Sequence, residues 1–189
     1  MRLATVTQSR EADRLAIEEI GIDGRVLMEN AGRGAALEIH RRLPPVPARV
    51  AVLCGGGNNG GDGFVIARHL RIAGHHVKAL LLADPRRLTK DCAFNLAIAR
   101  KMAALDALSV SAAARWSAGG PSLEVIDTPD ERSWEGFAVV LYGAHCIVDA
   151  MLGTGLSADV RGLCATAIDA VNARADGRLV FAADVPSGL

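Results

Sequence analysis

The sequence predicts an α/β fold: a three-layer α/β/α sandwich, Rossmann-like, around a mainly parallel sheet. Strand-length apolar runs alternate with helical patterns from residue 49 onward, which is typical of βαβ units with right-handed crossovers. One run, Val77 to Ala83, is apolar nearly throughout, as expected for a strand that is buried on both faces. Half of the 189 residues are hydrophobic and only 4% are aromatic, which suits alanine-rich helices covering such a sheet.

The first half of the chain supplies two helices before the sheet begins. Thr5 and Gln8 can form a capping box that opens a helix from about Val6 to Ile20. A second helix is expected from about Arg25 to Leu43, where Pro44 and Pro45 stop it. The elements that follow are a strand at 49–54, a glycine-rich loop at 55–63, a helix from 64 to about 74, the strand 77–83, a turn at 84–85 and a helix to about 104.

The second half continues the alternation. After a loop at 117–122 we expect a short strand from Leu123 to Asp127, and then a short helix capped by Thr128 with Pro129 at its first position. Strands are expected at 146–151 and 179–185, with a helix at 160–175 between them. The chain is interpreted as one domain over residues 1–189 that lacks its last C-terminal elements, because no covering helix follows the final strand.

Composition argues against several classes of protein. Lys plus Arg and Asp plus Glu both number 21, so there is no basic excess to favour nucleic-acid binding. No run approaches the ~18 apolar residues of a membrane span, and the N-terminal residues lack the apolar core of a signal peptide. The four cysteines are scattered, which indicates a reducing compartment. We therefore expect a cytoplasmic protein.

The stretch from Gly55 to Gly63 is the most informative part of the chain. Six of its nine residues are glycine, and the others are Asn58, Asn59 and Asp62. Glycine lets the backbone approach a ligand closely, and the amides of a loop that opens a helix favour phosphate. The stretch therefore predicts a nucleotide-like ligand.

The same stretch leaves other interpretations open. Gly55, Gly57 and Gly60 fit the spacing of the dinucleotide-binding fingerprint. Asp84 follows Gly60 by 24 residues, near the place of a ribose-binding acid, so an NAD-dependent oxidoreductase is an alternative. A tight structural turn without a ligand is a further alternative. A P-loop is disfavoured because no Lys-Ser or Lys-Thr pair follows the glycines.

Two more motifs follow strands. Asp149 stands at the end of one predicted strand, before the loop 153–159, and Asp184 stands at the end of the last, before Ser187. Because the carboxyl ends of parallel strands meet at one edge of a sheet, all three motifs are expected at one ligand site.

Together these segments resemble the NAD(P)H-hydrate epimerases, the family of the YjeF N-terminal domain. The resemblance extends in order from residue 27 almost to the end of the chain. It is carried by Leu27–Gly32, Gly57–Gly63, Val148–Ala150 with Gly153–Leu156, Val160–Gly162 and Asp184–Gly188.

The resemblance implies an isomerase. Members of the family interconvert the R and S forms of NADHX and NADPHX, hydrates of the reduced nicotinamide dinucleotides, and an NAD(P)HX dehydratase acts as their functional partner. The implied substrate-binding residues are Asn58, Asn59, Gly60, Gly61, Asp62, Gly153, Thr154, Gly155, Leu156, Ser157, Ala158, Asp159 and Asp184. The family also implies a potassium ion held by Asn59, Asp149 and Ser187.

We assign proton transfer to Asp149 as well, since a positioned carboxylate can take up a proton and return it. The family further implies a homodimer formed near residues 6–43, where Leu27, Ala31 and Ala35 make an apolar face. A non-catalytic dimerisation or binding module of the same fold, as in messenger-RNA decapping enhancers and an apolipoprotein-binding protein, is the remaining alternative. Asn59, Asp149 and Asp184 favour the enzyme, because a scaffold does not need them.

Overall fold

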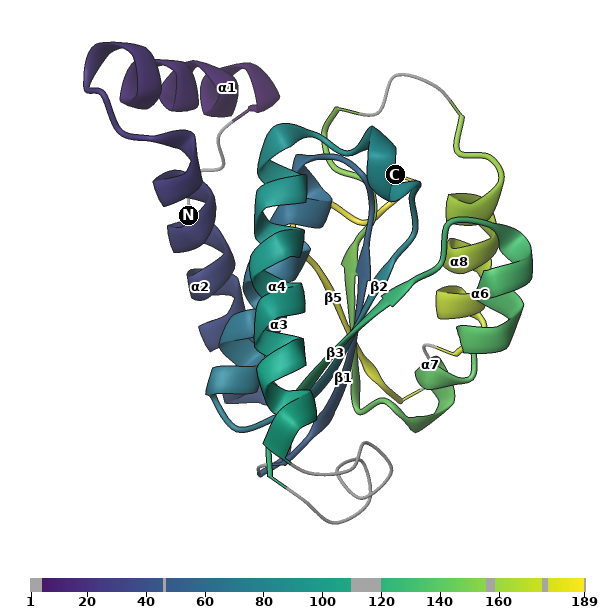
Figure 1. Ribbon diagram of the computed structural model, residues 1–189. Coiled ribbons are helices and arrows are strands. Elements are labelled where there is room, and N and C mark those ends of the chain that lie inside the picture. The colour runs from purple at the N-terminus through teal and green to yellow at the C-terminus, as the bar shows by residue number, and fades with distance from the viewer. Residues whose placement is uncertain (1–4, 46, 110–119, 156–158, 175–176, 189) are drawn as a thin grey trace.

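The computed structural model describes the chain except residues 1–4, 46, 110–119, 156–158, 175–176 and 189. Its centre is a five-stranded parallel sheet with the order β3-β2-β1-β4-β5 (Figure 1). The strand β1 (Arg49–Cys54) pairs with β2 (His76–Leu81) on one side and with β4 (Cys146–Ala150) on the other. The outer strands are β3 (Ser122–Asp127) and β5 (Leu179–Ala182). The predicted parallel sheet is confirmed.

Helices cover both faces of the sheet (Figure 1). One layer consists of α2 (Gly24–Arg42), α3 (Asn58–Ile72) and α4 (Lys90–Ser109), and the other of α6 (Glu131–Phe137), α7 (Val140–Gly143) and α8 (Leu163–Asn172). Alternate residues of β1 point into the two layers: Val50 and Val52 pack with the first, Ala51 and Leu53 with the second, and all four are fully buried. The predicted three-layer sandwich is confirmed.

The helix after β1 begins six residues earlier than expected. It starts at Asn58 and not at Phe64, so most of the predicted glycine-rich loop forms its first turns. A Cβ atom on Gly61 would lie 2.8 Å from the Sδ atom of Met28, and one on Gly63 would lie 2.7 Å from the Cβ atom of Ala150. These glycines therefore allow the helix to lie close to its neighbours.

Other boundaries were also wrong by a few residues. The cap of α6 is Asp130, because Thr128 is buried and its hydroxyl donates to the carbonyl of Leu81 at 2.8 Å. The helix α8 begins at Leu163 because Gly162 adopts a φ of 60°. The strands β2 and β5 end at 81 and 182, α4 runs on to 109, and a short helix η2 (Pro85–Arg87) fills the turn after β2. Residues 117–119 of the expected loop at 117–122 lie outside the described residues, and Ser122 already belongs to β3.

The first helix stands apart from the sheet (Figure 1). The helix α1 (Val6–Arg14) has the predicted capping box between Thr5 and Gln8, and a π-helical turn, η1 (Leu15–Glu19), continues it. None of the residues in α1 or η1 is buried.

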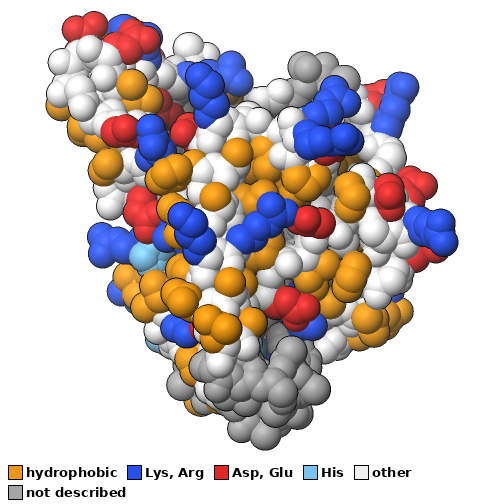
Figure 2. Space-filling model, in the orientation of Figure 1, with side chains coloured by type: hydrophobic (Ala, Val, Ile, Leu, Met, Phe, Trp, Pro, Cys, Tyr) orange, Lys and Arg blue, Asp and Glu red, His pale blue; other side chains and the backbone are white. Residues whose placement is uncertain are grey.

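Large hydrophobic side chains remain exposed on the same flank. Figure 2 shows them between charged side chains on the side of the molecule where α1, α2 and α4 lie. Of the expected apolar face of α2, Leu27 is partly buried and Ala31 is exposed. Ala35 packs partly buried against the core, whereas Val26 and Leu37 are about half exposed, at 50% and 49%.

Candidate functional site

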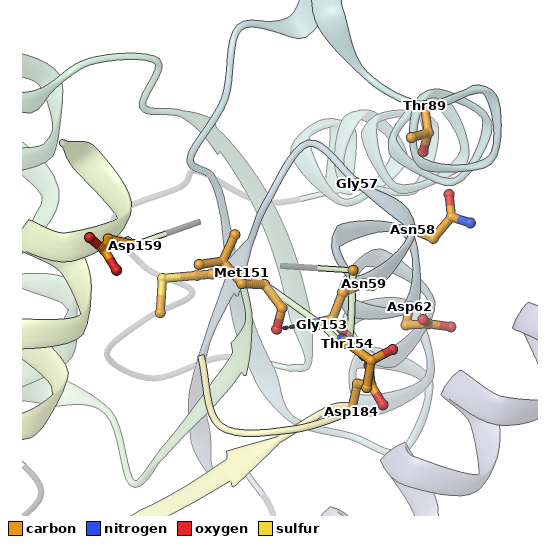
Figure 3. A pocket seen from close by; sticks show the side chains of 12 residues that line it. Gly57, Asn58, Asn59, Asp62, Thr89, Met151, Gly153, Thr154, Asp159 and Asp184 are labelled. Carbon is orange, nitrogen blue, oxygen red and sulfur yellow. Dashed lines mark hydrogen bonds between the residues drawn. The ribbon is translucent and has the colours of Figure 1, made fainter. Parts of the chain in front are cut away.

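A cleft of about 620 Å³ opens at the carboxyl ends of the strands. The chain leaves β1 for α3 on one face and leaves β4 for α8 on the other, so the strand order reverses between β1 and β4, where ligands of open α/β sheets bind. The volume suits an organic ligand. The cleft is lined by Gly57, Asn58, Asn59, Asp62, Thr89, Met151, Leu152, Gly153, Thr154, Gly155, Asp159 and Asp184 (Figure 3).

Gly55 lets the segment after β1 pack directly on the segment after β4, and Gly60 lets α3 pack directly on Gly55. A Cβ atom on Gly55 would lie 2.0 Å from the carbonyl oxygen of Met151, and one on Gly60 would lie 1.8 Å from the carbonyl oxygen of Gly55. Gly57 has no atom within 4 Å of the place of its Cβ, and it faces the cleft. Of these three fingerprint glycines, two are therefore required by packing.

The three residues assigned to an ion are brought together beside the cleft, which Asn59 also lines. The carboxylate of Asp149 accepts from the backbone N–H of Ser187 at 2.7 Å and from its hydroxyl at 2.5 Å. Leu152 connects this pair to Asn59, since its carbonyl accepts from Asn59 Nδ2 at 2.8 Å and its N–H donates to Ser187 Oγ at 3.0 Å. Residues from α3, from the end of β4 and from beyond β5 thus form one polar cluster.

The side-chain oxygen of Asn59 fits a cation at this cluster. Asn59 Oδ1 is buried and has no hydrogen-bond partner among the described residues, and a buried polar atom without a partner is costly. Within the same part of the chain, no group of three or more His, Cys, Asp or Glu side chains could hold a metal ion. Amide, hydroxyl and carboxylate oxygens are instead the donors available, and they suit a hard cation.

The carboxylate of Asp149 is held from several sides. Besides the two bonds from Ser187, it accepts from the N–H of Met151 at 3.2 Å, and Asp149 is only 7% exposed. Asp149 is not among the residues that line the cleft. Its role in proton transfer stays a prediction.

Three carboxylates lie in the cleft itself. Asp184 accepts from the N–H of Thr154 at 2.9 Å, and a Cβ atom on Gly153 would lie 2.7 Å from Asp184 Oδ2, so glycine there makes the approach possible. Figure 3 shows Asp62 near Thr154 and Asp184, with Asp159 across the cleft. Burial, followed by the nearby negative charges of Asp184 and Asp13, raises the pKa of Asp62 to about 7.

Replacing Asp62 by asparagine should stabilise the protein at high pH. The pKa of Asp62 is raised from 3.8, so its charge destabilises the fold increasingly as pH rises from about 4 to about 7. The variant should gain on the order of 1–3 kcal/mol at pH 8 and nothing at pH 4, since one pKa unit is about 1.4 kcal/mol and solvent screens part of the effect. Urea unfolding at both pH values measures this.

Asp159→Asn is the matched control, because Asp159 is an exposed carboxylate of the same cleft. Its substitution should change the free energy of unfolding little at either pH. An Asp62→Asn variant that is no more stable than the wild type at pH 8 would contradict the electrostatic argument.

The remaining predicted residues divide into three groups. Asn58, Thr154, Gly155 and Asp159 line the cleft, whereas Gly60 and Gly61 are buried in α3 and do not. Leu156, Ser157 and Ala158 lie outside the described residues.

Sequence reasoning missed Thr89, Met151 and Leu152. Met151 directly follows the motif that contains Asp149, so its place could have been expected. Thr89 follows β2, the neighbour of β1, and its N–H donates to the carbonyl of Gly56 at 3.0 Å. No sequence pattern around Thr89 predicts this contact between the segment after β2 and the segment after β1.

Asp84, which the oxidoreductase alternative would need as its ribose-binding acid, forms other contacts in the structure. The carboxylate of Asp84 caps η2 by accepting from the N–H of Arg86 at 3.0 Å, and it pairs with the guanidinium of Arg86 at 2.8 Å. Asp84 does not line the cleft.

Comparisons with known proteins identify relatives that match nearly the whole chain. A protein named NAD(P)H-hydrate epimerase from Pirellula staleyi is 39% identical over 96% of this chain, which spans 70% of that relative. One of the same name from Rhodopirellula baltica is 38% identical over 98% of the chain, which spans 65% of it. The bifunctional NAD(P)H-hydrate repair enzyme Nnr from Salinibacter ruber is 39% identical over 98% of this chain, which spans 32% of its length.

A crystal structure of the yeast protein ynu0 shares the fold, with a TM-score of 0.76 and 23% identity over 100% of this chain and 72% of that one. The profile of one family, described as YjeF-related protein N-terminus, matches residues 24–189. That range contains all three strand-end motifs of the cleft. The chain therefore belongs to the YjeF-related N-terminal family.

Proposed function

We propose that this protein is an isomerase that epimerises the R and S forms of NADHX and NADPHX. The observation that carries the proposal is the 620 Å³ cleft, in which motifs following β1, β4 and β5 meet at the point where the strand order reverses. Relatives that match nearly the whole chain at 38–39% identity are named NAD(P)H-hydrate epimerase.

The geometry gives the oxidoreductase alternative less support. Asp84 would have to break both its cap and its ion pair to reach a ribose. The alternative of a binding module gives no reason for a buried Asp149 that is held by three donors, or for a buried amide oxygen without a partner at Asn59. A buried amide oxygen without a partner costs stability, which suggests that it serves a function.

In the proposed mechanism, the first turn of α3 and the segment 153–155 bind and orient the dinucleotide. The hydroxyl and amide groups of Thr89 and Asn58 offer hydrogen bonds from one wall, and the carboxylates of Asp62 and Asp184 can accept from hydroxyl groups of the substrate. A carboxylate oxygen of Asp149 would take the hydroxyl proton of the hydrate while the ring C–N bond at the hydrated carbon breaks, which gives a ring-opened carbonyl form. When the ring nitrogen attacks the other face of that carbonyl, the C–N bond forms again with inverted configuration and Asp149 returns the proton, so the enzyme is unchanged.

A potassium ion is the proposed cofactor, and Asn59, Asp149 and Ser187 would hold it. The unpartnered Asn59 Oδ1 supports this assignment. When bound, the ion would supply positive charge that offsets the substrate phosphates beside the acidic residues. In this proposal the ion therefore strengthens binding of the substrate.

A chiral assay tests the proposal. We expect the purified chain to convert (S)-NADPHX into the R/S mixture in potassium chloride, and to do so at least about tenfold more slowly when choline replaces potassium. Reduced nicotinamide absorbance measured with added ketones or aldehydes would detect hydride transfer, which the oxidoreductase alternative requires. A folded chain that leaves the single epimer unchanged in both salts would overturn the proposal.

The functional partner that we propose is an NAD(P)HX dehydratase, on a separate chain or in the same polypeptide. The relatives named bifunctional repair enzymes support it, because this chain spans only about a third of their length. We assign the pair to the cytoplasm, where the four unpaired cysteines would stay reduced. Imaging of a tagged full-length protein outside the cytoplasm would refute that assignment. No helix among the described residues is long and apolar enough to cross a membrane.

We also propose a homodimer that covers the flank formed by α1 and α2. The exposed Leu15, Ile17, Val26 and Leu37 support it, since they lie in residues 6–43 and are 42–50% exposed. Light scattering at micromolar concentration should give the mass of two chains. The mass of one chain would contradict the dimer.

A further inference from the structure

One face of α1 is directed at the cleft. Val6, Arg10 and Asp13 are spaced as i, i+4 and i+7, which places them on the same side of a helix. Val6 lines a second cavity of about 210 Å³ together with Gly153 and Thr154. Arg10 Nη2 donates to the carbonyl of Thr154 at 3.4 Å, and the charge of Asp13 contributes to the raised pKa of Asp62. All three residues thus approach walls of the cleft, although the family profile starts only at residue 24.

The cleft needs positive charge from outside its own lining. Its charged residues are Asp62, Asp159 and Asp184, and no Lys, Arg or His is among the described residues that line it. A dinucleotide carries two negative charges on its pyrophosphate. The proposed potassium ion would offset part of this charge, and Arg10 reaches the edge of the cleft at Thr154, where its guanidinium can offset more.

Most N–H groups of the Arg10 guanidinium have no hydrogen-bond partner among the described residues. Its one described hydrogen bond goes to a neutral carbonyl at the long end of the range, and no ion pair is recorded for it among the described residues. Arg14, one turn further on, differs, because its guanidinium is held by Glu11 at 2.9 Å and by Glu18 at 2.8 Å. Of the two arginines, Arg10 alone combines contact with the cleft and unused N–H groups.

From this geometry, we infer that Arg10 binds the pyrophosphate of the substrate and that α1 forms an additional wall of the cleft. The inference rests on the proposed dinucleotide substrate. A guanidinium can donate two parallel hydrogen bonds to phosphate oxygens, which a carbonyl cannot accept in the same way. Arg10 is thus a binding residue supplied by α1, which precedes residues 24–189, the range that the family profile matches.

Calorimetric titration with ADP-ribose tests the role without requiring turnover, because the probe contains the pyrophosphate but no nicotinamide. Arg10→Gln should weaken binding by about 10- to 100-fold, the usual contribution of hydrogen bonds to a charged group. Arg14→Gln is the matched control: it removes an arginine from the same helix and breaks only exposed ion pairs, so binding should change less than about twofold. Arg10→Lys should restore part of the affinity by keeping the charge.

Kinetics give an independent readout. If Arg10 binds the pyrophosphate equally in the ground state and the transition state, Arg10→Gln raises KM for NADPHX by the same factor and leaves kcat within about twofold. ADP-ribose binding that is unchanged in Arg10→Gln would overturn the inference, and so would an equal loss in Arg14→Gln. Wild-type binding without epimerisation, with a selective loss in Arg10→Gln, would support the inference while refuting the proposed reaction.

Discussion

Asp149→Asn is expected to slow epimerisation by about 10²- to 10⁴-fold, the usual contribution of general acid–base catalysis. Asparagine has nearly the same size and still offers one oxygen, but it cannot take up a proton at neutral pH. Binding of NADPHX should therefore stay within a few-fold of the wild type. Single-turnover epimerisation measured beside equilibrium binding separates the two effects.

The contacts of Asp149 suggest a second explanation for a loss of rate in Asp149→Asn, namely weaker binding of the ion. The carboxylate accepts two hydrogen bonds from Ser187, and an asparagine amide group would place its own N–H against one of those donors. If Asp149 serves only the ion, added potassium should restore much of the rate in Asp149→Asn. If it transfers the proton, potassium should have no such effect.

Ser187→Ala is the matched control for loosening of the segment after β5. It removes the hydroxyl donor but leaves the backbone N–H that donates to Asp149 at 2.7 Å. Because Ser187 is also a proposed ion ligand, a loss of rate in Ser187→Ala as large as in Asp149→Asn would indicate disorder of this segment only if added potassium does not restore it. Near-normal turnover of Asp149→Asn without extra potassium would exclude both roles and direct attention to Asp62, which lines the cleft with a pKa of about 7.

Most of the sheet could be predicted because its strands carry their own signal. The apolar runs at 49–54, 77–83 and 146–151 are long and continuous, since central parallel strands are buried on both faces. The edge strand β5 was predicted to end at residue 185 but ends at Ala182. Asp184 and Val185 follow its apolar run without pairing in the sheet. Strand positions thus follow from local sequence, whereas strand ends depend on pairing.

The start of α3 could not be read in the same way. Each glycine in a helix interior costs up to about 1 kcal/mol relative to alanine, so Gly60, Gly61 and Gly63 argue locally for a loop. In the structure they lie against Gly55, Met28 and Ala150, and a Cβ atom at any of the three would come within 2.8 Å of a neighbouring atom. Tertiary packing therefore overrides helix propensity at these positions.

The site was predictable only where motifs directly follow strands. Asn59, Asp149 and Ser187 were expected together, because parallel strands bring their carboxyl ends to one edge, and the structure places them in one cluster. Thr89 and Arg10 reach the cleft through contacts with Gly56 and Thr154. These contacts join segments that lie far apart in the sequence and share no motif. Such contacts depend on how helices pack on the finished sheet.

Gly60 is the glycine with the closest packing, and its replacement should have the second of the two largest predicted effects. Gly60→Ala should destabilise the protein by about 3 kcal/mol, the upper part of the range for overpacked interiors. The new Cβ atom would lie 1.8 Å from the carbonyl oxygen of Gly55, and the same turn touches Met151 through Gly55. A backbone atom cannot move aside as the end of a side chain can, so α3 would have to shift away from Gly55. Urea unfolding followed by circular dichroism measures the loss.

Gly57→Ala is the control in the same stretch. Gly57 is the N-cap of α3 with extended backbone, its φ of −90° suits alanine, and nothing lies within 4 Å of the place of a Cβ atom. Its stability should fall by about 1 kcal/mol or less, as for a weaker cap. Because Gly57 lines the cleft, the added methyl group should instead weaken binding of ADP-ribose. Equal losses of stability in the two variants would contradict the assignment of Gly60 to packing and Gly57 to the ligand.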